Sequence, residues 1–312
     1  MPQNNIMLRI ILAVIIAVTI AGCGGKTEET GDKKLNIITT TGMIADAIEN
    51  ITGDKATVTA LMGPGVDPHL YKASQGDLTK LRGADIIFYN GLHLEGKMQE
   101  IFDQLSKEKP VFAISASIDE KKLRNVAQVS GISTHDPHIW FDVLMWSECV
   151  EEIGKKLSET DPTNAAFYKE NTRIYLEKLK QLDEDVKNKI ASIPPENRIL
   201  ITSHDAFGYY GRAYGIEVKG LQGISTAAEF GLKDITDMVN MIIDLKVKAV
   251  FVESSVSEKS INAVREGCKQ KGHELKSGGT LFSDAMGAKD TPEGNYIGMV
   301  QHNTNIIYEA LK

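Results

Sequence analysis

The chain has 312 residues, of which 42% are hydrophobic and 25% charged, a composition typical of globular rather than disordered proteins. Its 35 basic and 42 acidic side chains give a net charge of −7, which argues against nucleic-acid binding through phosphates. Three cysteines are too few for a disulfide scaffold or for a zinc site of four thiolates.

The N-terminus has the features of a lipoprotein signal. Residues 10–20, IILAVIIAVTI, would span about 16 Å as a helix, against about 30 Å for the hydrocarbon core of a membrane. Two small residues and then Cys23 follow, an order that resembles the lipobox of bacterial lipoproteins. We predict a signal peptide over residues 1–22, lipidation of Cys23 and a flexible tether over residues 23–34. The alternative is an ordinary signal peptide with an incidental cysteine. Cleavage would remove 22 residues and one arginine, leaving 290 residues with a net charge of −8.

Strand-like and helix-like segments alternate along the rest of the chain. Strands are predicted over residues 35–41, 55–62, 84–91 and 111–115, with helices over 42–52, 75–83 and 95–105. The same alternation of strands and helices begins again later in the chain, with strands predicted over residues 198–204, 248–255 and around 278–282. This alternation is typical of parallel sheets flanked by helices. The fold class is therefore predicted to be α/β, with two lobes over residues 35–160 and 196–312.

One long helix is predicted between the lobes, over residues 161–195. Asp161 is a candidate N-cap, Pro162 a candidate first helical residue, and Pro194 and Pro195 would stop the helix. Its apolar residues recur on one face: Tyr168, Tyr175, Leu179, Leu182, Val186, Ile190 and Ile193. We expect a rigid helix of about 45 Å that packs along both lobes and restricts hinge opening. A solvated helix in one large domain is the alternative.

Three histidines and one aspartate lie in loops that follow predicted strands or open predicted helices. They are His69 in GPGVDPHLY, His138 in DPHIWFD, His204 at the end of RILITSH, and Asp284 in GGTLFSDAMG. In open parallel sheets ligands bind beyond the carboxyl ends of the strands, so two facing lobes would bring these residues to one cleft. Three imidazoles and a carboxylate suit a divalent transition metal, although no HExxH or paired CxxC motif is present.

Seven motifs in order extend this pattern over essentially the whole chain from Leu35. They read GPGVDPHLYKAS, NGLHLEGKM, DPHIWFD, TSHDAFGYYGRAYG, GLQGIST, FVESSVS and GGTLFSDAMG. Together they resemble the zinc/manganese solute-binding lipoproteins of metal ABC importers, the TroA-like family. The resemblance implies two α/β lobes joined by a long rigid helix, with a metal site in the cleft between them. Its ligand motifs fall on His69, His138, His204 and Asp284.

The resemblance also implies a function. It indicates a protein without enzymatic activity, extracytoplasmic and lipid-anchored, that captures Zn²⁺ or Mn²⁺ as transported ligand. Its partners would be the membrane permease and ATPase of an ABC importer, and it would act as a monomer. Because each histidine must lose a proton to coordinate, binding is expected to weaken below about pH 6.

The choice of metal depends on the third ligand position. Many manganese-selective members of that family carry Glu where this chain has His204, and zinc-binding members commonly carry His. Zinc specialists often also have a long His-rich loop before the second ligand motif, where this chain has VAQVSGISTHDPH. His204 therefore favours zinc, whereas the absence of a His-rich loop argues against a zinc specialist, and a carrier of zinc or manganese is expected. His135 is weighed as an additional loop ligand.

Neighbouring polar residues are candidates to support the site. A metal-bound imidazole usually donates its other N–H to an acceptor, and the candidates are Asp67, Asp142, Asp205 and Glu253, with helix capping as the alternative role. Arg212 is predicted to neutralise Glu253 or Asp284.

Other chemistry-bearing residues need no role in the site. Cys149 and Cys268 are predicted to be free buried thiols. Trp140 and Trp146 are predicted to pack in the core or the cleft wall. The remaining histidines, predicted to be exposed or structural, are His93, His273 and His302.

Two other function classes stay open from the residues alone. A zinc hydrolase usually has three protein ligands and an open position for water, and Asp284 could be its base beside a three-histidine site. A surface adhesin would also suit a lipid anchor, but it would not require four converging ligands.

Overall fold

The first lobe is built on a four-stranded parallel sheet. In the computed structural model, which describes residues 34–129, 132–227 and 230–312, the strand order is β2-β1-β3-β4. The predicted signal peptide, Cys23 and all but the last residue of the predicted tether lie outside the described residues. The strands are β1 (Leu35–Thr39), β2 (Ala56–Ala60), β3 (Ile86–Tyr89) and β4 (Val111–Ala113). The helices are α2 (Gly42–Thr52), α3 (Gln75–Gly83), α4 (Gln99–Leu105) and α5 (Val143–Thr160).

An antiparallel hairpin also belongs to this lobe and was not predicted. It consists of β5 (Asn125–Val129) and β6 (Ile132–His135), which pair with a register shift. The hairpin leads directly into Asp136 and His138, so it determines where the second predicted ligand enters the cleft.

The second lobe contains two parallel strand pairs, β7 with β8 and β9 with β10. β7 (Ile199–His204) also lies next to β9 (Ala249–Glu253), so the two pairs are neighbours. The outer strands are β8 (Glu217–Gln222) and β10 (Lys276–Leu281). Helices α7 (Gly208–Tyr214), α8 (Leu232–Asp244), α9 (Lys259–Gln270) and α10 (Tyr296–Leu311) complete the lobe. The predicted fold class, two α/β lobes with parallel strands, is confirmed.

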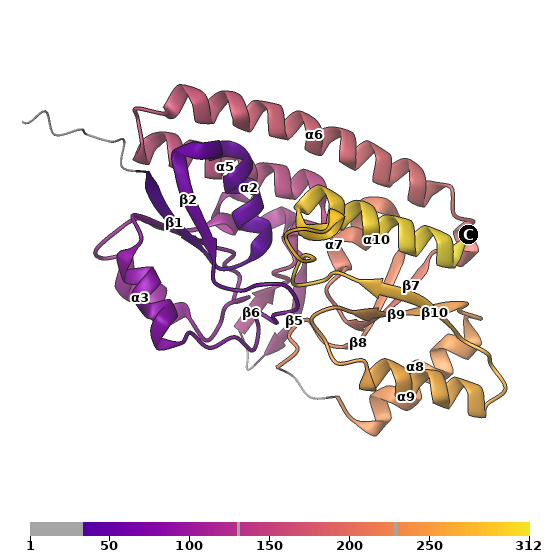
Figure 1. The fold of residues 1–312 in the computed structure, drawn as a ribbon. Helices are drawn as coiled ribbons and strands as arrows, with labels where there is room; N and C mark the ends of the chain where they lie inside the picture. The colour runs from indigo at the N-terminus through magenta and orange to yellow at the C-terminus, as the bar shows by residue number, and fades with distance from the viewer. Residues whose placement is uncertain (1–33, 130–131, 228–229) are drawn as a thin grey trace, which may run out of the picture. The chain divides into compact units, whose positions relative to one another are not determined.

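Helix α6 (Ala165–Ala191) runs over elements of both lobes (Figure 1). It contacts α2 and α5 of the first lobe and α7 and α10 of the second. It begins three residues later than the capping pattern predicted, because Asp161 ends α5 with a hydrogen bond from its N–H to the Leu157 carbonyl. The Asp161 carboxylate accepts hydrogen bonds from Asn164 Nδ2 and Tyr168 OH, each at 2.7 Å, so it still stabilises the start of α6.

The largest hydrophobic core is continuous across the two lobes. It includes Ile37 of β1, Trp146 of α5, Leu179 of α6 and Phe251 of β9, all fully buried or nearly so. Two smaller cores are confined to one lobe each. Tyr296 of α10 stacks on the Trp146 ring with centroids 5.2 Å apart, so the two lobes share packed aromatic surface. This continuity agrees with the expectation that hinge opening is restricted.

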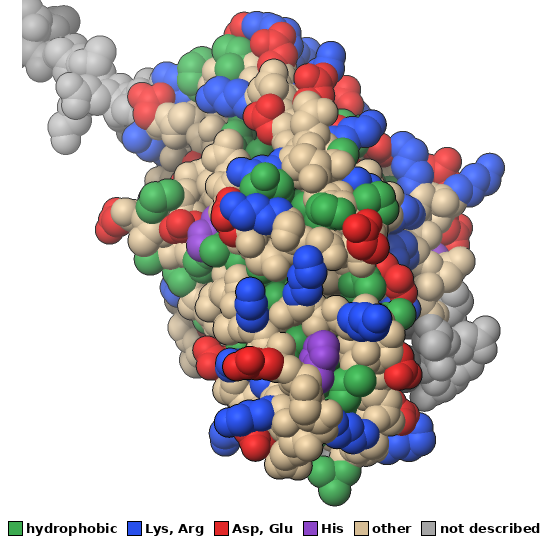
Figure 2. Space-filling view, turned by 90° about the vertical axis from the view of Figure 1, so that its right-hand side faces the viewer, with side chains coloured by type: hydrophobic (Ala, Val, Ile, Leu, Met, Phe, Trp, Pro, Cys, Tyr) green, Lys and Arg blue, Asp and Glu red, His purple; other side chains and the backbone are tan. Residues whose placement is uncertain are grey.

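The surface carries mixed charge. On the face shown in Figure 2, Lys and Arg side chains are interspersed with Asp and Glu. Among the described residues, no helix is both long enough and apolar enough to cross a membrane.

Candidate metal centre

Three of the four predicted ligands lie at or shortly after the end of a strand, and His69 lies in the turn between β2 and α3. His204 is the last residue of β7, and Asp284 follows β10 closely. His138 follows the β5–β6 hairpin, and its backbone N–H donates to Asp136 Oδ1 at 3.0 Å. The turn that carries His69 contains Gly65 at φ 71° and is fixed by a bond from the His69 N–H to Asp67 Oδ1 at 2.8 Å.

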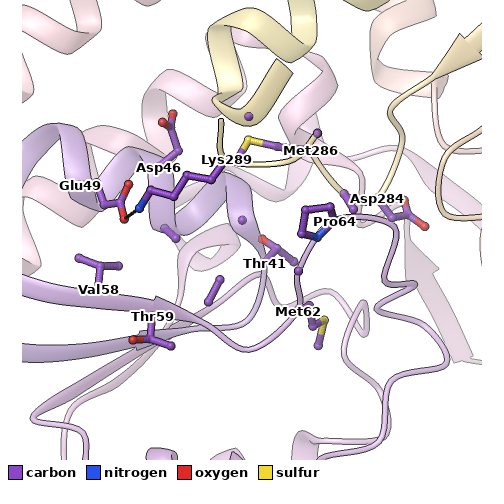
Figure 3. A pocket seen from close by; sticks show the side chains of 17 residues that line it. Thr41, Asp46, Glu49, Val58, Thr59, Met62, Pro64, Asp284, Met286 and Lys289 are labelled. Atoms are coloured by element: carbon purple, nitrogen blue, oxygen red, sulfur yellow. Dashed lines mark hydrogen bonds and ion pairs between the residues drawn. The ribbon is translucent and has the colours of Figure 1, made fainter. Parts of the chain in front are cut away.

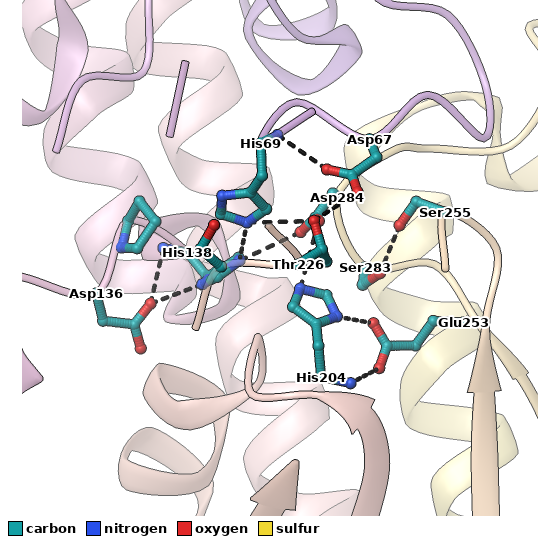
Figure 4. Close-up of polar contacts among 12 residues, drawn as sticks. Asp67, His69, Asp136, His138, His204, Thr226, Glu253, Ser255, Ser283 and Asp284 are labelled. Carbon is teal, nitrogen blue, oxygen red and sulfur yellow. Dashed lines mark hydrogen bonds and ion pairs between the residues drawn. The ribbon is translucent and has the colours of Figure 1, made fainter. Parts of the chain in front are cut away.

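The structure brings all four side chains together (Figure 4). One donor atom from each lies within 4.8 Å of the other three. His69 Nε2 is 3.3 Å from His138 Nε2, and the Asp284 carboxylate is 3.3 Å from the Nε2 atoms of both His138 and His204 and 3.8 Å from that of His69. Tetrahedral coordination with metal–nitrogen bonds of about 2.0–2.1 Å separates donor atoms by about 3.3–3.4 Å, which these spacings approach.

These donors are sealed from solvent and lack ordinary partners. The side chains of His138, His204 and Asp284 are fully buried, and that of His69 is nearly so. Both Asp284 oxygens and His204 Nε2 are buried without a hydrogen-bond partner. Burying such atoms unpartnered costs about 1–3 kcal/mol each, so the cluster fits a bound cation better than a structural role.

Opposite charges and burial shift the pKa values in this cluster in different directions. Burial lowers the pKa of His69 to about 4. Burial would also lower that of His138, but Asp136 and Asp284 outweigh it and raise the pKa to about 9. Burial opposes the same effect at His204, where Glu253 and Asp284 raise the pKa well above its usual value. The Asp284 pKa lies well below its usual range, since His204 and His138 overcome desolvation.

Two carboxylates contact the Nδ1 atoms of His138 and His204 and so fix the orientation of these imidazole rings. Glu253, a predicted candidate, forms an ion pair with His204 Nδ1 and accepts the His204 backbone N–H at 2.8 Å. Asp136, which the sequence analysis missed, accepts from His138 Nδ1 at 2.7 Å. Both contacts leave Nε2 of the histidine facing the cluster. The sequence signal for Asp136 was present, since it stands two residues before His138.

The other candidate carboxylates have different roles. Asp67 accepts the His69 N–H and also the Thr226 hydroxyl at 2.6 Å, and so joins loops of the two lobes. Asp142 caps α5 by accepting the N–H groups of Leu144 and Met145. The capping alternative is therefore correct for Asp142. Asp205 was also a candidate, but the Nδ1 atoms of His138 and His204 are paired with Asp136 and Glu253 instead.

The prediction for Arg212 is wrong. Its side chain is 42% exposed and lies 3.7 Å from Asp142, not at Glu253 or Asp284. It also donates to the Lys122 carbonyl at 2.6 Å and lies over the Tyr209 ring. The arginine that reaches a carboxylate of the site is Arg124, which pairs with Asp136.

A buried carboxylate in the NGLHLEGKM motif connects two loops of the first lobe. Glu95 accepts the Thr40 hydroxyl at 2.6 Å and the Asn90 N–H at 2.8 Å. Asn90 Nδ2 in turn donates to the Pro137 carbonyl at 3.0 Å, one residue before His138. This motif therefore supports the His138 loop rather than supplying a ligand.

The remaining predictions concern residues outside the cluster. His135 lies 3.6 Å from Glu120 and is not part of the group of four. Cys149 and Cys268 are free and buried, as predicted. Trp140 and Trp146 are buried in the core, and Trp140 Nε1 donates to the Ser283 carbonyl across the lobes.

A cavity of about 290 Å³ lies on the other side of the Asp284 segment (Figure 3). It is lined by residues of α2, of the loop after β2 and of the segment from Asp284 to Gly294. An ion pair between Glu49 and Lys289, at 2.9 Å, bridges it. Of the four clustered residues only Asp284 borders this cavity, so the cluster and the cavity are separate features.

Comparison with known proteins gives close relatives along almost the full length. The manganese-binding lipoprotein MntA of Bacillus subtilis is 48% identical over 305 residues, covering 97% of this chain and 99% of MntA. The manganese ABC transporter substrate-binding lipoprotein PsaA of Streptococcus mitis is 31% identical, covering 96% and 97%. The solved structure of the periplasmic zinc-binding protein TroA of Treponema pallidum matches with a TM-score of 0.86 at 45% identity, covering 89% and 99%.

Fold, buried cluster and relatives together define the class as a solute-binding protein of an ABC transporter, not an enzyme. The family model described as ZnuA, zinc-uptake complex component A periplasmic, matches residues 37–310, and the chain belongs to this family. The relatives are named as lipoproteins or as periplasmic, which places the class outside the cytoplasm and at the membrane.

Proposed function

We propose that this chain captures Zn²⁺ or Mn²⁺ outside the cytoplasm and delivers the ion to the permease and ATPase of an ABC importer. The observation that carries the proposal is the sealed cluster of four donors from two lobes, with unpartnered oxygens on Asp284. A cation would satisfy those atoms, and imidazole with carboxylate is a donor set for divalent transition metals.

The proposed ligands are His69, His138, His204 and Asp284. In their neutral forms the three imidazoles would each offer one Nε2 lone pair, and Asp284 would supply the negative charge. Asp136 and Glu253 hold the Nδ1 sides of His138 and His204 and thereby fix which nitrogen faces the ion. Affinity would arise because the ion exchanges water for preorganised donors in a dry site.

Zinc is proposed to bind more tightly than manganese. Affinity for a given site with nitrogen donors rises from Mn²⁺ to Zn²⁺, and three imidazoles are a nitrogen-rich set. One close relative is named for manganese and another for zinc, so relatives of this chain are associated with both metals. Manganese transport would then depend on which ion is available rather than on a higher affinity.

The remaining parts of the proposal concern attachment and assembly. We propose that Cys23 carries a lipid and that residues 23–34 act as its tether, with the folded part acting as a monomer. Since both lobes contribute ligands, release is proposed to follow a lobe or loop movement that the docked permease favours.

The geometry disfavours a hydrolase. Four protein donors would fill a tetrahedral zinc ion and leave no position for an activated water. Asp284 lies 3.3 Å from two imidazole nitrogens, which is the spacing of a fellow ligand rather than that of a base beside a three-histidine site.

Metal analysis of the purified protein, followed by competitive titration of Zn²⁺ against Mn²⁺, tests the proposal. We expect one ion per chain and a Kd below 1 μM for zinc, equivalent to about −8 kcal/mol or better. If no first-row metal binds more tightly than about 10 μM, the proposal is wrong.

Substitution of one ligand gives a second test with an internal control. His204→Ala should weaken zinc binding at least about 100-fold, since one donor is lost and Glu253 is left buried without its imidazole partner. His302→Ala removes a histidine that lies by the Thr280 carbonyl and Glu293, away from the cluster, and should leave the Kd unchanged. Robust ester or peptide hydrolysis by the zinc-loaded protein that His204→Ala abolishes would instead support an enzyme.

A further inference from the structure

We propose that Arg124 is a positioning residue for the metal site, coupling the placement of His138 to helix α7 of the opposite lobe. This inference rests on the proposed function, because it assigns a role in metal binding to a residue that touches none of the four ligands. The structure assigns this role through three contacts of the Arg124 guanidinium and backbone.

The first contact connects Arg124 to the metal ligand through one carboxylate. Its Nη1 pairs with Asp136 Oδ2, while Asp136 Oδ1 accepts from His138 Nδ1 at 2.7 Å. Asp136 is fully buried, and the guanidinium pairs with Oδ2, the carboxylate oxygen that does not contact His138. Arg124 therefore holds the carboxylate that fixes the imidazole ring of His138.

The second contact ties the same group to the second lobe. Arg124 lies 5.8 Å from the centroid of the Tyr209 ring, and its backbone N–H donates to the Tyr209 hydroxyl at 3.0 Å. That hydroxyl donates to the Asp136 carbonyl at 2.9 Å. Tyr209 belongs to α7, which starts four residues after His204, so one helix is linked to two ligand segments.

The third contact is a close approach of the Arg124 guanidinium to the backbone of α7 at Gly208. A Cβ placed on Gly208, the first residue of α7, would overlap the Arg124 guanidinium. The guanidinium therefore packs directly against the backbone of α7. A shift of α7 relative to the first lobe would displace Arg124, then Asp136, then His138. Lobe movement is thereby converted into a change at one metal ligand.

Arg212 provides a matched control from the same structure. It also lies over the Tyr209 ring, at 4.9 Å, and near a carboxylate, Asp142, but that carboxylate caps α5 and does not touch a clustered histidine. Removing Arg212 therefore removes an arginine from the same aromatic ring without disturbing Asp136.

The first experiment measures the Kd for Zn²⁺ and the visible absorption spectrum of the Co²⁺-loaded full chain. Arg124→Met should weaken zinc binding by about 10- to 100-fold and alter the cobalt spectrum, because the His138 ring loses its fixed orientation. Arg124→Lys should bind zinc more tightly than Arg124→Met but less tightly than the natural chain. Lysine restores the positive charge but lacks the planar guanidinium with its paired N–H donors. Arg212→Met should leave both the Kd and the spectrum unchanged.

The second experiment uses the opposite lobe. Gly208→Ala should reproduce the effect of Arg124→Met on the zinc Kd, although Gly208 touches no ligand. The two changes together should be no worse than either alone, since both displace the same guanidinium. Gly76→Ala, at a helical glycine with room for a Cβ, serves as control and should not change the Kd.

The outcomes separate this inference from the proposed function. If the unaltered chain binds neither Zn²⁺ nor Co²⁺, the proposed function fails. If it binds both, but Arg124→Met lowers only the melting temperature and leaves Kd and spectrum unchanged, Arg124 is merely structural and the inference is overturned. Additive effects of Arg124→Met and Gly208→Ala would overturn the coupling to α7.

Discussion

At the scale of single residues, the ion-free cluster balances its charge with protons. His138 and His204 have raised pKa values, while Asp284 has a strongly lowered one. When no ion is bound, the neighbouring carboxylates favour the protonated forms of His138 and His204, whereas burial lowers the pKa of His69 to about 4 and favours its neutral form. A divalent cation that displaces two protons leaves the net charge of the buried site unchanged.

We predict that metal binding releases about two protons near pH 7.5. Because the raised pKa values belong to the ion-free state, affinity should rise with pH at least up to about 9, where His138 loses its proton, and His204 extends the rise in the same direction. An unperturbed imidazole would predict weakening only below about pH 6, so the structure moves the onset of weakening to higher pH. Calorimetry in buffers of different ionisation enthalpy measures the proton count. An enthalpy that is identical in all buffers would contradict it.

The sequence predicted the four clustered residues because each follows a strand end or opens a helix, where parallel sheets place their ligands. Asp136 was missed although it stands two residues before His138 in the DPH motif, whereas Arg124 could not be predicted because its contact with Asp136 depends on the β5–β6 hairpin. The residues VAQV and ISTH alternate too weakly to indicate a strand pair. Arg212 was assigned to the wrong carboxylate because its position in the sequence, close to His204, does not show towards which residues its side chain points from α7.

At the scale of elements, short capping networks hold the ligand loops. Ser74 and Asp77 form a capping box at the start of α3, and Asp77 also accepts the Tyr71 hydroxyl at 2.8 Å. Tyr71 stands two residues after the proposed ligand His69, so the capping box and the His69 loop are connected by this hydrogen bond. Burial alone would raise the pKa of Asp77, but hydrogen bonds from Ser74, Tyr71 and Lys80 lower it to about 2.

We predict that Asp77→Ala lowers the free energy of unfolding by about 0.5–2 kcal/mol, the usual cost of a lost cap. Since the folded pKa lies below the unfolded value of about 3.9, the charge-dependent part is complete above pH 4. It is lost as pH falls from about 4 to 2. Urea titrations at several pH values measure this, with Asp77→Asn as the variant that lacks the pH-dependent part. Equal pH profiles for the natural chain and Asp77→Asn would refute the assignment.

The boundaries of elements were the least predictable feature. Asp161 and Pro162 look like a helix start, yet Asp161 completes α5, and its side chain accepts a hydrogen bond from Asn164 Nδ2 just before α6 begins. β8 was missed because Lys219 and Gly220 interrupt its apolar alternation. Gly220 is required there, since a Cβ would collide with the backbone of His204 and Asp205. Hydrogen bonds between α5 and α6 decided the first boundary, and pairing with β7 decided the second.

At the scale of the whole molecule, the shared core makes the lobes dependent on each other. Tyr175 and Leu179 of α6 are buried, and Tyr175 donates a hydrogen bond to Asp46 of α2 at 2.9 Å. Asp46 also accepts the Tyr296 N–H at 3.2 Å, at the start of α10. One carboxylate thus joins the connecting helix to both lobes, and the lobes are expected to unfold together.

We predict one cooperative unfolding transition for the natural chain, and a loss of about 2–5 kcal/mol in Leu179→Ala without a second transition. Near-ultraviolet and far-ultraviolet circular dichroism should give the same midpoint in both proteins. Lys187→Ala, at an exposed position of the same helix, should stay within about 0.5 kcal/mol of the natural chain. Separate midpoints for the two signals would mean that the lobes are independent.

The sealed position of the four donors has a kinetic consequence. An external chelator cannot form a ternary complex with an ion whose donors are all buried, so exchange must wait for the protein to open. The rate of ion loss should then reach a plateau as chelator concentration rises, and the plateau equals the opening rate. Under the proposed function, the packing between the lobes would set how long the ion is retained, and the four donors would set how tightly it is bound.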